Sequence, residues 1–238
     1  MKVRDALILM AGAGSRLGSS KTAKPLLPIA GRPLISYALD ALKGVGVERL
    51  HVVLGANPDA LASQLRPLVE PEMELNAIHN PEWRKQNGVS VLQAADAIAA
   101  PFLLAMADHL FQPSIIADLI ARSDTTRLNL AVDRKIESIF DLDDAMKVQT
   151  SGGKVVAISK TLSDFDAIDT GLFLCPNELF DYLRGALHDG DCSLADGVRL
   201  MAADGKVQAI DIGDAWWQDV DTPEMLQRAE AESARLFG

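Results

Sequence analysis

The stretch that decides the fold is ALILMAGAGSRLGSSKTAKPLLPIAGRPLISY, which runs from Ala6 to Tyr37. Its first five residues form a short apolar run that is typical of a buried strand. The run leads directly into a loop that contains Gly12, Gly14 and Arg16, and Lys24 follows a few residues later. Glycines let backbone N–H groups approach a ligand closely, and the two basic side chains add positive charge. This loop therefore indicates a site for an anion.

Two common glycine-rich phosphate loops do not fit the spacing. A dinucleotide fingerprint needs a third glycine where the chain has Leu17, and an acid after the second strand, which instead ends in LGA. A P-loop would end in Gly-Lys-Ser or Gly-Lys-Thr, and Leu17-Gly18-Ser19 does not match that pattern. The residues alone leave two interpretations open: an anion held by backbone and basic side chains, or a tight turn with solvated basic residues.

The composition is that of a globular chain with an acidic balance. The 238 residues are 48% hydrophobic and 24% charged, which is enough apolar material for a sizeable core. The formal net charge of −10 argues against a nucleic-acid partner, because no general positive field attracts a polyanion. A small phosphate ligand remains compatible with this charge when metal ions neutralise carboxylates. We expect a single domain over residues 1–238.

The two cysteines and the apolar runs bear on the compartment. Cys175 and Cys192 form neither a C-x-x-C pair nor metal-ligand spacing, so we expect ordinary reduced thiols. The first residues lack the pattern of a signal peptide, and no apolar run is long enough to span a bilayer. The sequence therefore predicts a soluble, cytoplasmic protein.

Short apolar strands alternate with helical patterns through the first part of the chain. The expected strands are Ala6–Met10, Arg49–Ala56, Met73–His79, Pro101–Asp108 and Leu128–Asp133. The expected helices are Pro33–Lys43, Pro58–Leu68, Val89–Ala99 and Pro113–Ser123. This alternation predicts an α/β fold with a mostly parallel central sheet covered on both faces.

The later part of the chain is richer in β structure. We expect a hairpin over Lys147–Ser159 that turns at Ser151-Gly152-Gly153. The remaining expected elements are a strand over Ala167–Cys175, helices near Pro176–Arg184 and Leu194–Ala203, strands over Val207–Ile212 and Ala215–Val220, and a final helix over Pro223–Phe237. This pattern predicts a small β-rich elaboration of the same domain.

Acidic residues stand at strand ends, where an α/β sheet gathers its ligands. Asp108 ends a buried apolar strand, and Asp219 and Asp221 alternate along one strand, so their carboxylates face the same side. Such oxygen donors suit Mg²⁺. The alternative is that these residues cap the helices that follow them. His109 is either a contact or a structural neighbour, and Trp216 and Trp217 are either a stacking surface or core.

Several stretches resemble a known group of enzymes. LMAGAGSRLG and KPLLPIAGRPLI resemble the signature of the sugar-phosphate-type nucleotidyltransferases, which join an NTP to a phosphorylated acceptor and release pyrophosphate. HNPEWRKQNGVSVLQA, MADHLF, DDAMKV, DFDAIDTGLFLC and WWQDVDTPE are most similar to inositol-1-phosphate and phosphocholine cytidylyltransferases. The resemblance implies a Rossmann-like, three-layer nucleotidyltransferase architecture with a small β-rich acceptor-binding elaboration.

The same resemblance implies a reaction and its residues. An ionised acceptor phosphate is already a nucleophile, so the enzyme has to position two anions and neutralise their charge. The implied activity is a Mg²⁺-dependent transfer of CMP from CTP to an alcohol phosphate, with inositol 1-phosphate favoured. Lys24 would contact the α-phosphate and Arg16 the β- and γ-phosphates. Asp108 and Asp221 would hold Mg²⁺, with Asp219 as a helper.

The resemblance also implies two sets of binding residues. The nucleotide-binding set is Met10, Ala11, Gly12, Gly14, Ser15, Asn87, Gly88 and Ser90. The acceptor-binding set is Asp133, Arg134, Lys147, Lys160, Asp169 and Thr170, in which basic side chains suit a phosphate while Asp and Thr suit hydroxyls. The acidic run Asp141, Asp143 and Asp144 lacks the spacing of a calcium loop and is interpreted as a solvated face.

Other functions stay open at this point. The acceptor could instead be phosphocholine, a phosphonate or a sugar 1-phosphate, and the nucleotide could be UTP. A nucleotide-binding module without turnover is a further alternative, although such a module needs neither the metal pair nor the α-phosphate lysine. A homodimer is possible.

Overall fold

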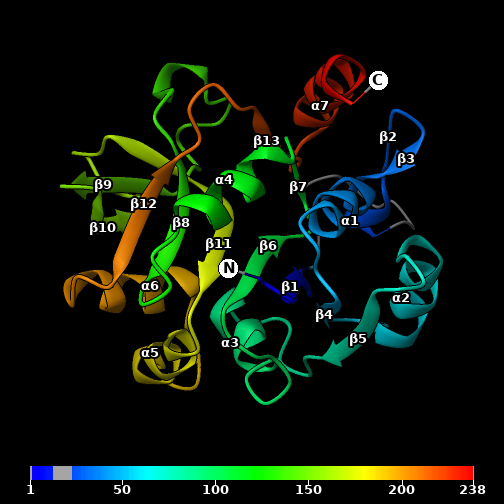
Figure 1. Cartoon of the computed structure of the whole chain (residues 1–238), viewed down its shortest axis with the longest axis horizontal. Helices are drawn as coiled ribbons and strands as arrows, with labels where there is room; N and C mark the ends of the chain where they lie inside the picture. The colour runs from blue at the N-terminus through cyan, green and yellow to red at the C-terminus, as the bar shows by residue number, and fades with distance from the viewer. Residues whose placement is uncertain (1, 13–22, 238) are drawn as a thin grey trace.

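In the computed structural model, residues 2–12 and 23–237 are described. Within these residues the main sheet has nine strands, in the order β5-β4-β1-β6-β11-β8-β12-β10-β9 (Figure 1). In that order the strands are Glu74–His79, Arg49–Leu54, Asp5–Met10, Phe102–Met106, Ala167–Cys175, Leu128–Asp133, Val207–Asp211, Lys154–Ser159 and Lys147–Ser151. This arrangement confirms the predicted α/β class.

The sheet is parallel in its first half and mixed in its second. β5, β4, β1 and β6 run parallel to one another, and β12 runs parallel to β8. β11 runs antiparallel between β6 and β8, and the β9–β10 hairpin extends the far edge. The predicted hairpin and the predicted strand over Ala167–Cys175 are both confirmed.

Helices cover both faces of the sheet, and the side chains of β1 alternate between the two cores that lie under these helices. Ala6, Ile8 and Met10 pack into the cluster that contains α1 (Leu34–Gly44), α2 (Pro58–Leu65) and α4 (Ser114–Arg122). Leu7 and Leu9 pack into the cluster that contains α3 (Asn87–Leu92), α5 (Glu178–Ala186) and α6 (Leu194–Ala203). A strand whose successive side chains face opposite helix layers is the signature of a three-layer fold.

A third, smaller cluster lies under the C-terminal helix α7 (Pro223–Leu236). It joins α7 to α1 and to the two-stranded pair β2 (Pro28–Ile29) and β3 (Arg32–Pro33). Figure 1 shows α7 beside this pair and near β7 (His109–Phe111). β7 pairs with β13 (Trp217–Asp219), so the chain segment just before α7 is fixed to the segment just after β6.

Several predicted boundaries are wrong by a few residues. The helix expected over Val89–Ala99 is α3, which begins earlier and ends at Leu92. The helix expected over Pro58–Leu68 ends as an α-helix at Leu65 and continues as a 3-10 turn, η3 (Arg66–Leu68). Pro67 lacks a backbone N–H and cannot continue the α-helical hydrogen bonds. β7 was not predicted, because the three-residue strand follows Asp108 without any turn signal.

Two further properties concern the chain as a whole. Cys175 and Cys192 are both buried and do not form a disulfide. Across the residues that the structure describes, no helix has the length and apolar character needed to cross a membrane.

Candidate active site

Three segments far apart in the sequence meet at the carboxyl ends of β1 and β6. The ammonium of Lys24, in the 3-10 turn η2 (Lys24–Leu26), donates to Oδ2 of Asp108 at 2.6 Å and to Oδ1 of Asp221. The Lys24 side chain is only 9% exposed. A buried ammonium held between two carboxylates is a charged centre, not a solvated surface lysine.

The pairing of Lys24 with the aspartates shifts the pKa values of the groups at this centre. Burial alone would lower the pKa of Lys24, but Asp108 and Asp221 raise it by more, so the side chain is a cation. Burial would raise the pKa of Asp108, but the hydrogen bond from His109 and the nearby charges hold it well below its ordinary value. Burial raises the pKa of Asp219, against the opposing charge of His109.

The alternative role of these acids as helix caps is not what the structure shows. The N-cap of α7 is Thr222, whose hydroxyl accepts from the backbone N–H of Met225 at 3.3 Å. The carboxylate of Asp221, one residue earlier, is therefore directed to Lys24. The carboxylate of Asp108 is shared between Lys24 and His109.

A cavity of about 330 Å³ lies on one side of this centre, and it collects the predicted nucleotide-binding residues. Ala11, which lines this cavity, packs closely against Gly55, where a Cβ would lie 2.4 Å from the backbone oxygen of Ala11. Predicted residues that line it are Met10, Ala11, Gly12, Lys24, Asn87, Ser90, Asp108 and Asp221, and Trp83 and Lys85 line it without having been predicted. Gly14, Ser15 and Arg16 lie outside the described residues.

The stretch Asn87–Ser90 is fixed by contacts behind this cavity. Oδ1 of Asn87 accepts from the backbone N–H of Leu194 at 2.8 Å, and Oγ of Ser90 accepts from Asn80 at 2.9 Å. A Cβ on Gly88 would lie 2.6 Å from the backbone oxygen of Cys192. Gly88 therefore allows α3 to pack closely against the segment before α6, which is a structural role different from the predicted ligand contact.

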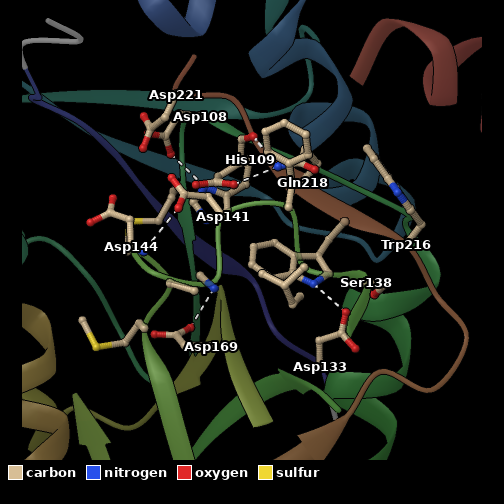
Figure 2. A pocket seen from close by; sticks show the side chains of 18 of the residues that line it. Asp108, His109, Asp133, Ser138, Asp141, Asp144, Asp169, Trp216, Gln218 and Asp221 are labelled. Carbon is tan, nitrogen blue, oxygen red and sulfur yellow. Dashed lines mark hydrogen bonds and ion pairs between the residues drawn. The ribbon is translucent and has the colours of Figure 1, made fainter. Parts of the chain in front are cut away.

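A second cavity, of about 440 Å³, adjoins the first. Figure 2 shows side chains that line this second cavity. Asn87, Met106, Asp108 and Asp221 line both cavities, so the two spaces meet at the charged centre. Of the predicted acceptor-binding residues, this second cavity is lined by Asp133, Lys160 and Asp169. Asp219 lines it as well. The two cavities thus share the two carboxylates, and Lys24, which lines the first cavity, pairs with both of them.

Asp169 lies at the base of the second cavity (Figure 2). Its Oδ1 accepts from the backbone N–H of Gly171 at 2.7 Å, across the bulge that interrupts the pairing of β11. Burial raises the pKa of Asp169 to about 6. A carboxylate in this position can accept hydrogen bonds from the hydroxyls of a bound molecule.

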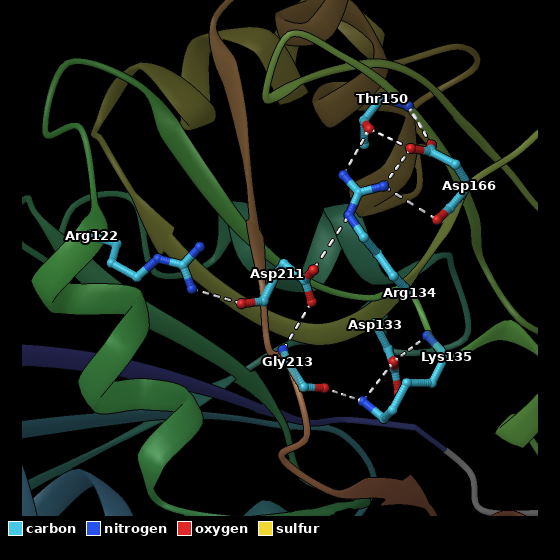
Figure 3. Close-up of polar contacts among 8 residues, drawn as sticks. All are labelled: Arg122, Asp133, Arg134, Lys135, Thr150, Asp166, Asp211 and Gly213. Carbon is cyan, nitrogen blue, oxygen red and sulfur yellow. Dashed lines mark hydrogen bonds and ion pairs between the residues drawn. The ribbon is translucent and has the colours of Figure 1, made fainter.

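Asp133 lines the second cavity but is already committed to its neighbours. Its Oδ1 accepts from the ammonium of Lys135 at 2.8 Å, and its Oδ2 accepts from Nε1 of Trp217 at 2.9 Å. Lys135 also donates to the backbone oxygen of Gly213 (Figure 3). A further bond runs from Lys135 to the backbone oxygen of Ala215. Asp133 therefore acts first as a buried anchor for the wall of the cavity.

The three other predicted acceptor residues do not line the second cavity. Arg134 pairs with Asp166 and reaches Thr150 of β9 and Asp211 of β12 (Figure 3). The ammonium of Lys147 donates to the backbone oxygen of Lys160 at 2.8 Å. Thr170 is fully buried, and its hydroxyl donates to the backbone oxygen of Ala131 at 2.8 Å.

The interpretation of the acidic run as a solvated face is wrong for two of its residues. Asp141 and Asp144 line the second cavity, and Asp144 pairs with Lys160 at 2.6 Å. A hydrophilic run that turns inward onto a polar cavity has the same local pattern as a solvated loop. Cavity residues that the sequence did not suggest include Lys135, Ser138, Phe140, Met146, Gln218 and Arg228.

The charged centre offers two carboxylates as possible ligands for Mg²⁺. In the described part of the chain, no group of three or more His, Cys, Asp or Glu side chains is arranged to hold a metal. Asp108 and Asp221 nevertheless converge on a single cation, the ammonium of Lys24. Two carboxylates fit Mg²⁺, which in phosphate-transfer sites takes its other ligands from substrate and water.

The fold, with two cavities meeting at a buried lysine and two aspartates, defines an α/β domain of the NTP transferase class. The chain belongs to the family of MobA-like NTP transferase domains, whose model matches residues 6–193.

Relatives and solved structures agree with this membership. A protein of Rubrobacter xylanophilus named "Bifunctional IPC transferase and DIPP synthase" is 33% identical over 94% of this chain and 51% of its own length. A protein of the same name from Thermococcus kodakarensis is 33% identical over 94% of this chain and 49% of its own length. This chain thus spans about half the length of these relatives.

The fold also matches a solved structure. The inositol-1-phosphate CTP transferase from T. maritima superposes with a TM-score of 0.83 at 24% identity, covering 97% of both chains. This likeness confirms the three-layer architecture predicted from the motifs.

Proposed function

We propose that this protein is a Mg²⁺-dependent cytidylyltransferase that transfers CMP from CTP to an alcohol phosphate and releases pyrophosphate. The observation that carries the proposal is the charged centre: Lys24, Asp108 and Asp221 lie where the two cavities meet. Transfer between two phosphates requires this arrangement, because both anions must approach one another across a neutralised gap.

In the proposed reaction, an oxygen of the acceptor phosphate attacks the α-phosphorus of CTP, and the bond to the pyrophosphate oxygen breaks. The ammonium of Lys24 would stabilise the charge that develops on the α-phosphate. Asp108 and Asp221 would hold Mg²⁺, which supplies positive charge to the phosphate oxygens. Asn87 and Ser90, both anchored from behind, would face the nucleotide. Arg16 stays a predicted contact of the β- and γ-phosphates.

Inositol 1-phosphate is the favoured acceptor. The motifs shared with inositol-1-phosphate cytidylyltransferases and the names of the two relatives both support it. The second cavity offers hydrogen-bonding side chains suited to a polyol, with Asp169 at its base and Lys160 at its wall. Lys160 would contribute positive charge toward the acceptor phosphate.

A cationic acceptor such as phosphocholine is the second candidate, and one feature favours it. The second cavity is lined by Trp216, Trp217 and Phe140 together with several carboxylates. Aromatic faces beside acidic groups attract a quaternary ammonium. The two candidates differ in the part of the acceptor that lies away from its phosphate.

Pyrophosphate release tests the proposal. Each of CTP, UTP, ATP and GTP would be paired with inositol 1-phosphate, phosphocholine, an aminoalkyl phosphonate and glucose 1-phosphate, with Mg²⁺ and with a chelator. We expect release with CTP and inositol 1-phosphate, abolished by the chelator and by the variants Lys24→Ala and Asp108→Asn. Lys43→Ala, which removes an exposed partner of Glu70, is the matched control. Release with no pair, while CTP still binds, would reject the enzyme in favour of a nucleotide-binding module.

The oligomeric state, the cytoplasmic location and the action of residues 1–238 as one domain stay predictions from the sequence.

A further inference from the structure

His109 divides the two oxygens of Asp108 between two donors. It is the first residue of β7, and its Nδ1 donates to Oδ1 of Asp108 at 2.8 Å. The other oxygen, Oδ2, accepts from Lys24 at 2.6 Å. A carboxylate with one oxygen bound by an ordered ring can no longer rotate freely about its terminal bond.

The imidazole ring of His109 is stacked on one face. The indole of Trp217 lies 5.7 Å away between ring centroids, with 14° between the planes. Trp217 is itself fixed, because its Nε1 donates to the buried carboxylate of Asp133 and its strand β13 pairs with β7. The position of the His109 ring therefore depends on Trp217, and that of Trp217 depends on Asp133, which Lys135 also contacts.

The edge of the ring meets the backbone of β11. A Cβ on Gly171 would lie 2.8 Å from Nε2 and 2.9 Å from Cδ2 of His109. Gly171 also has a φ of +73°, in the bulge that Asp169 closes with its hydrogen bond. Only glycine gives both the space for the ring and this backbone conformation without strain.

We propose that His109 is a positioning residue that sets the orientation of the Asp108 carboxylate, and that Gly171 and Trp217 hold His109 in place. The inference rests on the proposed function, in which Asp108 serves the transfer. Its physical basis is that a group acting at a reacting centre must keep its geometry within a fraction of an ångström, and neighbours outside the centre provide that constraint. His109 does not act on substrate itself in this proposal.

Two substitutions of His109 test the donor. His109→Asn can place an amide N–H near the position of Nδ1, whereas His109→Leu keeps bulk and removes the donor. We expect kcat to fall by about 10- to 100-fold in His109→Leu, with the KM values for CTP and acceptor changing by less than about threefold. His109→Asn is expected to recover about tenfold of that loss.

A second readout does not depend on turnover. The affinity for Mn²⁺ in the presence of CTP, measured by electron paramagnetic resonance, depends on how the Asp108 carboxylate is held and needs no turnover. We expect it to weaken by about 10-fold or more in His109→Leu and to be partly restored in His109→Asn. Thermal unfolding of both variants controls for loss of the fold.

Two glycine-to-alanine variants test whether the packing of Gly171 against the ring of His109 matters. Gly171 and Gly153 have φ values of +73° and +78°, but a Cβ on Gly153 would have no atom within 4 Å. Both alanine variants carry similar backbone strain, and only Gly171→Ala displaces the His109 ring. We expect Gly171→Ala to lose kcat and Mn²⁺ affinity as His109→Leu does, and Gly153→Ala to keep both. The double variant Gly171→Ala/His109→Leu should be no worse than either single one.

The proposal is overturned if His109→Leu keeps the kcat and the Mn²⁺ affinity of the unchanged protein. It is also overturned if His109→Asn and His109→Leu lose both quantities equally, since the donor would then be irrelevant. If the unchanged protein releases no pyrophosphate with any substrate pair, the proposed function fails, and the Mn²⁺ measurements still decide the role of His109.

Discussion

The ammonium of Lys24 lies 2.6 Å from Oδ2 of Asp108, although 84 residues separate them in the chain. The same ammonium reaches Asp221, near the start of α7. One buried cation thus joins the loop region after β1, the end of β6 and the C-terminal helix. The contacts of Lys24 with Asp108 and Asp221 therefore fix the relative positions of these three segments at the site.

Replacing Lys24 by methionine tests this centre. The methionine side chain keeps most of the length and apolar volume of lysine but removes the cation shared by the two half-buried carboxylates, Asp108 and Asp221. We expect kcat for pyrophosphate release to fall by about 10²- to 10³-fold, because a preorganised charge aimed at the transition state is lost. Lys43→Met, at an exposed pair, should keep full activity. A Lys24→Met enzyme within threefold of the unchanged protein would contradict the role.

Asp169→Asn is expected to weaken acceptor binding and to stabilise the protein at alkaline pH. The pKa of Asp169 in the folded protein is about 6, above the ordinary value of 3.8, because the carboxylate is buried. Between these two values the folded state binds more protons than the unfolded state, so stability falls as pH rises through this window. Above about pH 6 the buried carboxylate of Asp169 is ionised, which lowers the stability of the unchanged protein. The neutral asparagine of the variant does not cause this loss of stability.

The measurement is thermal unfolding of both proteins at pH 4 and pH 8, together with the acceptor KM. At pH 8 we expect Asp169→Asn to unfold roughly 2–6 °C higher, corresponding to about 1–2 kcal/mol. At pH 4 the difference should shrink. The acceptor KM should rise more steeply in the unchanged protein than in the variant as pH falls through 6, because the acceptor phosphate itself also takes up a proton near this pH in both. Equal Tm differences at the two pH values would contradict this assignment.

Asp5 is expected to stabilise the fold without serving the site. It is buried at the first residue of β1, so it lies at the end of the strand opposite the candidate site. Its carboxylate accepts from Arg49 and His51. Burial alone would raise its pKa, but hydrogen bonds and charges from these two partners lower it below the ordinary value. The resulting stability is present above the unfolded pKa near 4 and is lost as pH falls through the folded pKa.

Urea unfolding of Asp5→Asn checks this expectation. At pH 7 the free energy of unfolding should fall by about 2–3 kcal/mol, since an ionic partner is removed from a buried group. The loss should diminish in acid. Asp40→Asn removes an exposed carboxylate that pairs with Arg32 and should cost less than about 0.5 kcal/mol. If both variants lose equal stability, the burial of Asp5 is not what matters.

Gly88→Ala is expected to reduce both stability and CTP affinity. The added Cβ would lie 2.6 Å from the backbone oxygen of Cys192 and 2.7 Å from the backbone carbon of Ser193, so α3 must move away from the segment before α6. That movement would displace Asn87 and Ser90 in the first cavity, which is proposed to hold the nucleotide and is called the nucleotide cavity below.

Gly185→Ala is the matched control, since this glycine is also helical and a Cβ there meets no atom within 4 Å. It should leave CTP binding unchanged and stabilise the protein by about 0.5–1 kcal/mol. Calorimetric titration with CTP and thermal unfolding distinguish the two. Equal CTP affinity in both variants would show that the packing of Gly88 does not support the nucleotide cavity.

The sequence by itself determined the layers and many of the residues that line the first cavity, which is proposed to hold the nucleotide. Apolar runs and helical periods are local properties, so they predicted the α/β sheet, the β9–β10 hairpin and β11 correctly. Strand ends in a parallel sheet meet at one edge, which is why Asp108 could be singled out from its position alone. Family motifs added Lys24 and Asp221, which the structure brings to the same centre.

Only the tertiary structure decided how the second cavity, proposed to hold the acceptor, is built. Neighbouring residues after β8 diverge, so that Arg134 turns to the hairpin while Lys135 turns inward to Asp133 and to the backbone oxygen of Gly213. Arg228 reaches the second cavity from α7, and Gly171 meets His109 through a bulge. These contacts depend on the register and packing of segments distant in the chain, which a local pattern does not encode.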